Sequence, residues 1–284
     1  MFAEVADSAR LALGEGPVWD AAAAQLRWIG IPDRCVLSHD PSTGHTVRTE
    51  LDTVPGTLAI GADGGAVLAT ERGFERLDLA TGRTDLLAAV EPDRPDRRMN
   101  DGKCDPYGRL VAGTMQFDEP RLPGPLYRLG ADGGVSAVLD GLAIPNGLAW
   151  PEPDRLWYID TPTRRIDLFA YPEHGPVGPL IRSIDVSRIP GMPDGMTLDA
   201  DGNLWVAFWD GWAVHCLSPA GRVLATVELP VPRPTSCTFG GPGLDTLWIT
   251  TATSSRHPAS GLLFRDAPGA KGLPAQLWSG PSDG

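Results

Sequence analysis

Four polar residues that offer oxygen as a ligand occupy similar settings along the chain. They are Glu15 in LGEGPVW, Asn100 in RMNDGKC, Asn146 in IPNGLAW and Asp194 in MPDGMTL, each close to a glycine and followed by an apolar run. Two carboxylates and two carboxamides, with no His or Cys among them, suit a hard divalent cation such as Ca²⁺, Mg²⁺ or Mn²⁺. Without a cation, two carboxylates that face each other would repel, and one would tend to hold a proton.

Each of these residues taken alone is better explained as a turn residue than as a ligand. Asn-Gly and Asp-Gly are common hairpin signals, and glycine after an acidic residue is ordinary. A shared site requires that residues far apart in the chain meet, so the elements that carry them decide between the two interpretations.

One type of strand recurs six times and gives the chain a period. QLRWIG, AVLATE, RLVAGT, RLWYID, NLWVAF and TLWITT each follow a turn, and their equivalent Leu or Val residues lie 41, 43, 46, 48 and 43 residues apart. This spacing is typical of propeller blades of about four strands. A second hairpin repeats in step with the first, as in FERLDLATGRTDLL and VHCLSPAGRVLATV.

Six repeats of four antiparallel strands account for nearly the whole chain. We therefore predict an all-β protein, a six-bladed β-propeller that forms one domain over residues 1–284. Either FAEVAD near the start or PAQLWS near the end could supply the outer strand that closes the last blade and covers its edge. The sequence does not choose between them.

In a propeller the first strand of each blade lines the central channel. Ten or eleven positions before the repeated Leu or Val stand Glu15, Gly56, Asn100, Asn146, Asp194 and, in the last repeat, Ser236 or Cys237. Residues at the same point of equivalent strands face one another around the axis. The shared register thus favours a common metal site over four unrelated turns.

Composition excludes several classes of function. The formal net charge of −12 repels phosphate backbones and anionic membranes, so we expect no nucleic acid and no membrane partner. The start has no basic segment followed by an apolar one, and no stretch is long enough to span a bilayer, which favours a cytoplasmic protein. Four scattered cysteines predict reduced, buried thiols, and most of the nine tryptophans are expected in the core between blades.

The motifs LGEGPVWD, RMNDGKCDPYGRLVAGTM, PNGLAW, PDGMTLDADGNLWVA and TSCTFGG resemble the family that joins gluconolactonase, senescence marker protein (regucalcin) and luciferin-regenerating enzyme. The resemblance runs from about residue 11 to 265 and implies a propeller with one divalent metal on its axis that hydrolyses sugar lactones. By motif, it implies that the metal ligands are Glu15, Asn146 and Asp194. It also implies substrate contacts from Arg98, Asn100 and Asp118, with Glu119 as an alternative to Asp118.

The resemblance leads us to expect a metal-dependent hydrolase that opens a sugar (aldono)lactone, with Asp194 as both ligand and general base. The ion could be Ca, Mn, Mg, Zn or Fe, and the partner is a small sugar lactone of undetermined identity. Arg98 could instead only neutralise nearby acids such as Asp101. The alternatives are a calcium-binding regulatory propeller of the regucalcin type, a metal-dependent ester or organophosphate hydrolase, and a propeller that only binds other proteins. The sequence carries no signal of oligomeric state.

Overall fold

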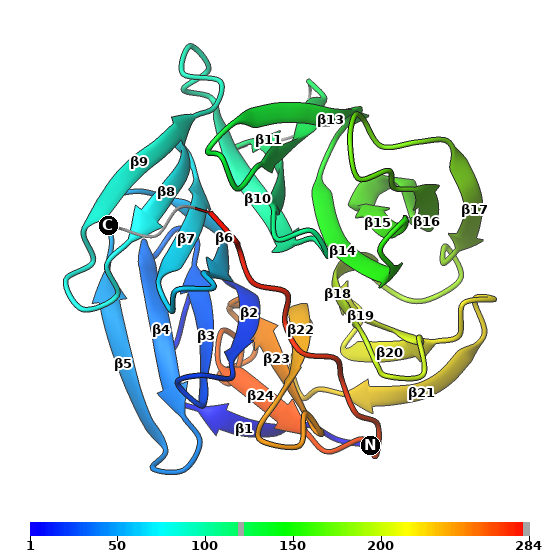
Figure 1. Ribbon diagram of the computed structural model, residues 1–284. Helices are drawn as coiled ribbons and strands as arrows, with labels where there is room; N and C mark the ends of the chain where they lie inside the picture. The colour runs from blue at the N-terminus through cyan, green and yellow to red at the C-terminus, as the bar shows by residue number, and fades with distance from the viewer. Residues whose placement is uncertain (119–121, 281–284) are drawn as a thin grey trace.

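A computed structural model describes residues 1–118 and 122–280. Six four-stranded antiparallel sheets are arranged as blades around a central channel, and each blade presents its first strand to the axis (Figure 1). The all-β, six-bladed prediction is therefore confirmed, with four strands in every blade.

The first three blades each follow the order of the chain. Blade 1 contains β2 (Gly14–Asp20), β3 (Gln25–Gly30), β4 (Cys35–Asp40) and β5 (His45–Glu50). Blade 2 contains β6 (Pro55–Ile60), β7 (Ala66–Thr70), β8 (Gly73–Leu77) and β9 (Thr84–Ala89). Blade 3 contains β10 (Arg97–Cys104), β11 (Leu110–Gln116), β12 (Gly124–Leu129) and β13 (Val135–Leu142).

The next two blades repeat this order, and the sixth departs from it. Blade 4 contains β14 (Pro145–Glu152), β15 (Arg155–Asp160), the 3-10 helix η1 (Thr161–Thr163), β16 (Arg165–Ala170) and β17 (Leu180–Asp185). Blade 5 contains β18 (Met192–Leu198), β19 (Leu204–Trp209), β20 (Ala213–Leu217) and β21 (Val223–Glu228). Blade 6 contains β22 (Pro234–Gly240), β23 (Thr246–Thr251), β24 (Leu263–Asp266) and β1 (Glu4–Asp7).

The N-terminal strand closes the ring. β1 pairs with β24 in an antiparallel register in which Glu4 faces Arg265 and Val5 faces Phe264. Strand β24 therefore has no open edge, and the first and last strands of the chain are joined in one sheet. Of the two segments that could have closed the last blade, FAEVAD does so.

The C-terminal segment that contains PAQLWS takes another path and crosses one end of the channel (Figure 1). It is held at one side by Gly272, whose N–H donates to the carbonyl of Leu244 over 2.7 Å. At the other side Trp278, only 1% exposed, donates from its N–H to the carbonyl of Ile60 over 2.8 Å. We call this end of the channel the lower mouth.

Apolar packing lies between the blades rather than at the axis. Six buried clusters form, each from residues of two neighbouring blades, so every blade packs on both of its faces. Four tryptophans in equivalent second strands are no more than 2% exposed, as the sequence predicted: Trp28, Trp157, Trp205 and Trp248. All four cysteines are free and buried, which also confirms the prediction. Because apolar side chains fill the interfaces, the channel is left for polar groups.

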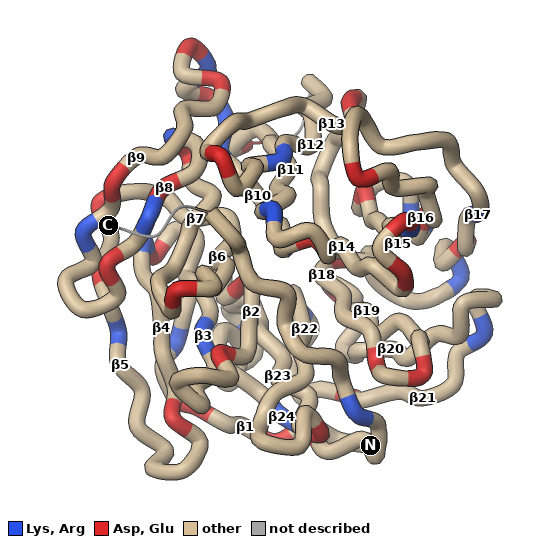
Figure 2. Tube along the Cα trace, in the orientation of Figure 1, with Lys and Arg blue, Asp and Glu red and all other residues tan. Residues whose placement is uncertain are grey.

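Charged residues are distributed around the whole ring (Figure 2). In the part of the chain that the structure describes, no helix is both long enough and apolar enough to cross a membrane.

Candidate metal centre

The four residues selected by register all lie inside the inner strands, not in hairpin turns. Every inner strand also contains a break in its pairing register at this position, for example between Glu15 and Val18 in β2 and between Asn146 and Leu148 in β14. Equivalent breaks occur in the other four inner strands. A β-bulge turns a side chain away from the regular alternation of a strand. The interpretation as turn residues is therefore wrong for these positions.

The adjacent glycines allow neighbouring inner strands to approach closely. A Cβ atom on Gly147 would lie 2.8 Å from the carbonyl oxygen of Asp194, and one on Gly195 would lie 2.1 Å from Oγ of Ser236. No larger residue fits at these positions without displacing the next blade. The pattern of a polar residue followed by glycine thus reflects strand packing around the axis.

Glu15 and Asp194 form a pair of buried carboxyl groups that act on each other electrostatically. They are 6% and 7% exposed. Burial, and then the charge of Asp101, raise the pKa of Glu15 to about 8. Burial, and then the charges of Glu15 and Asp101, raise the pKa of Asp194 well above its usual range. Such a pair binds protons in the absence of a cation and is well suited to binding a cation instead.

Arg98, Asn100 and Asn146 are joined by hydrogen bonds. Nη1 of Arg98 donates to Oδ1 of Asn100 over 2.7 Å. Nδ2 of Asn100 donates to Oδ1 of Asn146 over 3.0 Å and to the carbonyl of Pro145 over 2.8 Å. Arg98 also interacts with the charge of Glu15, while burial lowers the pKa of its guanidinium to about 10. Five of the six site residues predicted from the sequence thus meet in the channel.

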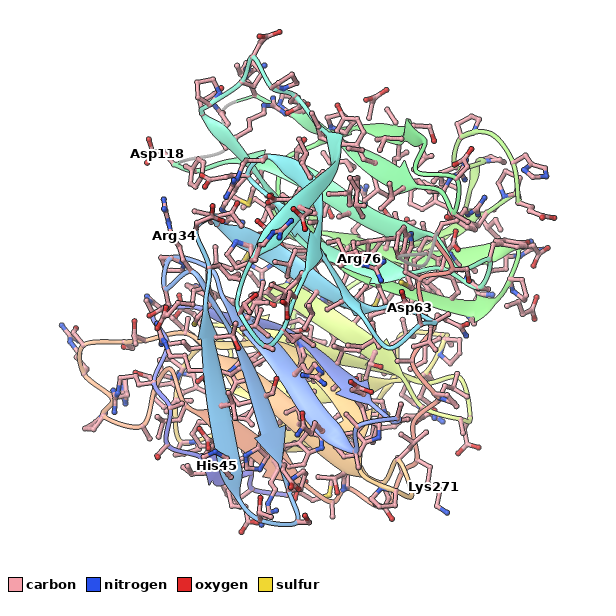
Figure 3. All side chains as sticks on the ribbon, turned by 60° about the vertical axis from the view of Figure 1, so that its left-hand side comes forward. Arg34, His45, Asp63, Arg76, Asp118 and Lys271 are labelled. Atoms are coloured by element: carbon pink, nitrogen blue, oxygen red, sulfur yellow. The ribbon has the colours of Figure 1, made fainter. Side chains whose placement is uncertain are left out.

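Asp118, the sixth, lies apart from this group. It is exposed in the β11–β12 connection and projects from the surface of the molecule (Figure 3). Glu119, the alternative to Asp118, lies outside the described residues. The role of Asp118 as a substrate contact stays a prediction.

Two further charged side chains in the channel were not selected from the sequence. Asp101 is 7% exposed, and its carboxylate accepts a hydrogen bond from the N–H of Gly102 over 2.7 Å. Lys103 donates from Nζ to the carbonyl of Met196 over 2.7 Å, and burial lowers its pKa. Charged residues at alternate positions of an inner strand, as in NDGKC, are the signal that could have identified them.

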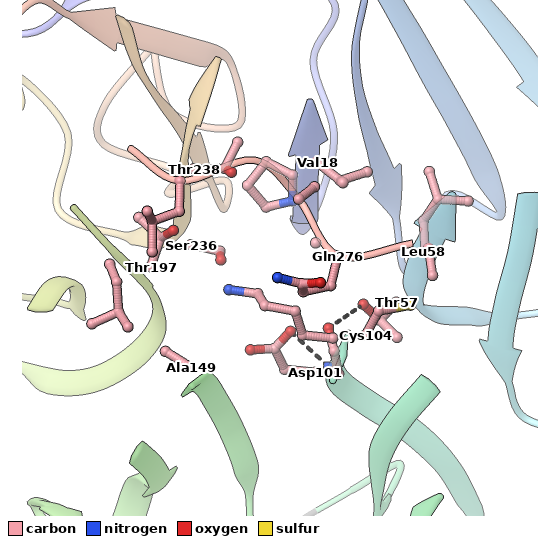
Figure 4. Close-up of a pocket in the computed structure, with 18 of the residues that line it drawn as sticks. Val18, Thr57, Leu58, Asp101, Cys104, Ala149, Thr197, Ser236, Thr238 and Gln276 are labelled. Atoms are coloured by element: carbon pink, nitrogen blue, oxygen red, sulfur yellow. Dashed lines mark hydrogen bonds between the residues drawn. The ribbon is translucent and has the colours of Figure 1, made fainter. Parts of the chain in front are cut away.

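On the side of the lower mouth lies a cavity of ≈ 110 Å³ that is lined by both apolar and polar side chains. Asp101, Ser236 and Thr57 line its walls, and Gln276 of the C-terminal segment reaches into it from the lower mouth (Figure 4). The site is thus covered from below by the chain itself.

The side chains fit a hard divalent cation. Among the described residues no cluster of three or more His, Cys, Asp or Glu side chains could hold a metal. Here two carboxylates would be completed by an amide oxygen, that of Asn146, which accepts one hydrogen bond and keeps a lone pair. If these three residues were the only protein ligands, coordination positions would remain open for water, as in metal sites that catalyse reactions.

A closed six-bladed propeller with oxygen-bearing side chains at its axis defines the class of protein. The chain belongs to the family described as the SMP-30/gluconolactonase/LRE-like region, whose model matches residues 13–253. It is 34% identical to regucalcin of Xenopus laevis over 94% of this chain and 95% of that protein. It is 35% identical to pentonolactonase XacC of Haloferax volcanii, over 92% of this chain and 93% of that protein.

The fold is shared with solved relatives. The calcium-binding protein regucalcin from Agrobacterium tumefaciens superimposes with a TM-score of 0.91 at 29% identity, over 97% of both chains. The resemblance inferred from the motifs is confirmed.

Proposed function

We propose that this protein is a divalent-metal-dependent lactonase that opens a sugar lactone to the corresponding aldonic acid. The observation that carries the proposal is the pair of buried carboxyl groups, Glu15 and Asp194, beside an amide oxygen of Asn146. The relationship to a pentonolactonase over nearly the full length of both chains supports the same chemistry. A calcium-binding relative supports a hard cation in the channel.

Hydrolysis of a lactone breaks the ester C–O bond, adds water across it and yields a carboxylate and a proton. When bound, the cation supplies Lewis-acid stabilisation of the developing negative charge and lowers the pKa of coordinated water. Asp194 is the proposed general base, since its carboxylate is buried among the proposed ligands and a carboxylate can accept the proton of the attacking water. Glu15 and Asn146 complete the protein ligands.

Arg98 and Asn100 are proposed to hold the substrate. Arg98 donates one hydrogen bond to Asn100, which leaves further N–H groups of its guanidinium for ring and hydroxyl oxygens. Orientation by such contacts lowers the entropic cost of reaching the reactive geometry. Asp118, which follows β11, is proposed as a further substrate contact on the grounds of the family motif alone.

The charges in the channel agree with a neutral substrate and an anionic product. Three carboxylates, Glu15, Asp101 and Asp194, face two cationic side chains, Arg98 and Lys103, a formal sum of −1 when all are ionised. One dication changes the sum to +1. A lactone brings no charge, and the carboxylate that forms from it then meets a positive site.

The test is to remove metal with a chelator, restore Ca²⁺, Mg²⁺, Mn²⁺, Zn²⁺ or Fe²⁺ one at a time, and follow acid release from a panel of aldonolactones. We expect no turnover without metal and recovery with at least one cation. Cation binding without hydrolysis of any lactone would favour a calcium-binding regulatory propeller. Hydrolysis of aryl esters or organophosphates in preference to lactones would favour the alternative of a metal-dependent ester or organophosphate hydrolase. Full activity after complete metal removal would refute the proposal.

A further inference from the structure

Thr161 connects two of the proposed metal ligands from neighbouring blades. It is the first residue of η1, follows β15 in blade 4 and is 8% exposed. Its Oγ1 accepts a hydrogen bond from Nδ2 of Asn146 over 2.7 Å. The same hydroxyl donates to the carbonyl of Pro193 over 2.8 Å, the residue directly before Asp194 in blade 5.

The direction of these hydrogen bonds is fixed by the chemistry of the partners. The carbonyl of Pro193 can only accept, so the single hydroxyl proton of Thr161 is used there. The hydroxyl can then only accept from Asn146, whose NH₂ group must face it. The amide oxygen of Asn146 is consequently turned to the opposite side, where it accepts the hydrogen bond from Nδ2 of Asn100.

The other end of the chain of hydrogen bonds imposes the same orientation. A guanidinium can only donate, so Arg98 requires the oxygen of Asn100 and leaves its NH₂ group to face Asn146. The bonds therefore run in one direction from Arg98 through Asn100, Asn146 and Thr161 to the Pro193 carbonyl. Each amide is held between two groups that permit only one of its two orientations.

The same turn is attached to blade 5 at a second place. Nη2 of Arg164, which directly follows η1, donates to the carbonyls of Ile189 and Gly191 over 3.1 and 3.0 Å. These residues lie in the segment that leads into β18. These two hydrogen bonds attach the turn that contains Thr161 to blade 5, and they therefore help to keep Thr161 next to Asn146.

We infer that Thr161 is a positioning residue of the metal centre: it presents the oxygen rather than the nitrogen of the Asn146 amide to the cation, and it holds the strands of Asn146 and Asp194 in fixed relation. This inference rests on the proposed metal centre. It concerns a residue that touches neither the proposed cation nor the substrate.

The test uses the nearly isosteric variant Thr161→Val, titrated with Ca²⁺ alone by calorimetry. Loss of the acceptor leaves the NH₂ group of Asn146 without its partner, so that the hydrogen bond from Asn100 alone holds the amide oxygen in place. We expect Ca²⁺ affinity to fall about 10- to 100-fold, the usual effect of removing a residue that orients a ligand. Thr161→Ser keeps the hydroxyl and should restore affinity to within about threefold of the wild type on the same grounds.

Thr163→Val is the matched control. The Thr163 hydroxyl lies in the same helical turn but donates to the carbonyl of Asp160 over 2.7 Å and contacts no proposed ligand. Its removal should leave Ca²⁺ affinity unchanged. If the valine variant at position 161 does not fold, Thr161→Ala provides the same comparison.

The outcomes separate this inference from the proposed function. Reduced Ca²⁺ affinity in Thr161→Val with rescue by serine supports it, even if the wild type hydrolyses no lactone. Unchanged affinity in Thr161→Val overturns it while a metal-dependent lactonase stands. An equal loss in Thr163→Val, or no rescue by serine, also overturns it. A wild-type protein that binds no divalent cation overturns both.

Discussion

Divalent-cation binding should become about 50-fold tighter between pH 6 and pH 8, because Glu15 must lose a proton before it can act as a ligand. Burial and the Asp101 charge raise the pKa of Glu15 to about 8. Its carboxyl is then only about 1% ionised at pH 6 and about half ionised at pH 8. Affinity rises with pH over this range and levels off above it. Asp194, whose pKa is raised as well, makes the rise steeper.

Glu15→Gln removes this titration while it preserves the size of the side chain. At pH 8 the variant should bind the cation at least on the order of a thousandfold more weakly, since even two unit charges 4 Å apart interact by about 4 kcal/mol at an effective dielectric constant of 20, and the cation carries a double charge. The dependence on pH should also become shallower. Any remaining dependence of cation affinity on pH then comes from Asp194.

Calorimetric titration in two buffers of different ionisation enthalpy measures both quantities. At pH 7 the wild type should release about one proton or more per cation bound, and Glu15→Gln about one fewer. A control titration of Asp118→Asn, which alters an exposed carboxylate, should match the wild type. Affinity that does not depend on pH, with no proton released, would refute the assignment of Glu15 as a buried ligand.

Three other substitutions test separate parts of the structure. Asp194→Ala should abolish tight cation binding and lactone hydrolysis while circular dichroism and melting show an intact fold, because the cores lie between blades; turnover near the wild-type rate would exclude Asp194 as ligand and base. Asn100→Ala should chiefly raise KM for the lactone and change cation affinity less than Asp194→Ala does, whereas an equal loss of affinity would make Asn100 a direct ligand. Trp278→Ala should reduce the free energy of unfolding in denaturant by about 3–5 kcal/mol, as for other buried aromatic residues. The control Leu277→Ala, which changes an exposed side chain, should leave the free energy of unfolding almost unchanged. A loss below about 1 kcal/mol in Trp278→Ala would show that the C-terminal segment contributes little to the stability of the fold.

The period of the repeated strand was sufficient to predict the number of blades and the strands in each. The repeated pattern is easy to recognise because it reflects packing. Residues such as Leu204 and Trp205 recur because each second strand packs against two neighbouring blades. The closing strand could not be predicted, because FAEVAD and PAQLWS are both short segments near a chain end that could serve as an outer strand. The choice depends on where the chain ends lie after the ring forms, which no local pattern records.

The candidate site was predictable only where it repeats. Glu15, Asn146 and Asp194 share a register in equivalent strands, so the period brought them together. Thr161 lies in the turn after a second strand and has no counterpart at the axis, so register could not select it. The same holds for Gln276, which enters the channel from a segment without regular structure. The breaks in the pairing register of the six inner strands were not predicted from the sequence either.

The most direct measurement is anomalous diffraction from a crystal soaked in Mn²⁺. We expect one strong anomalous peak in the channel, with oxygens of Glu15, Asn146 and Asp194 at coordination distance. The NH₂ group of Asn146 should still donate its hydrogen bond to Oγ1 of Thr161. No peak in the channel at saturating Mn²⁺, or a peak bound by other residues, would contradict the assignment of the metal centre.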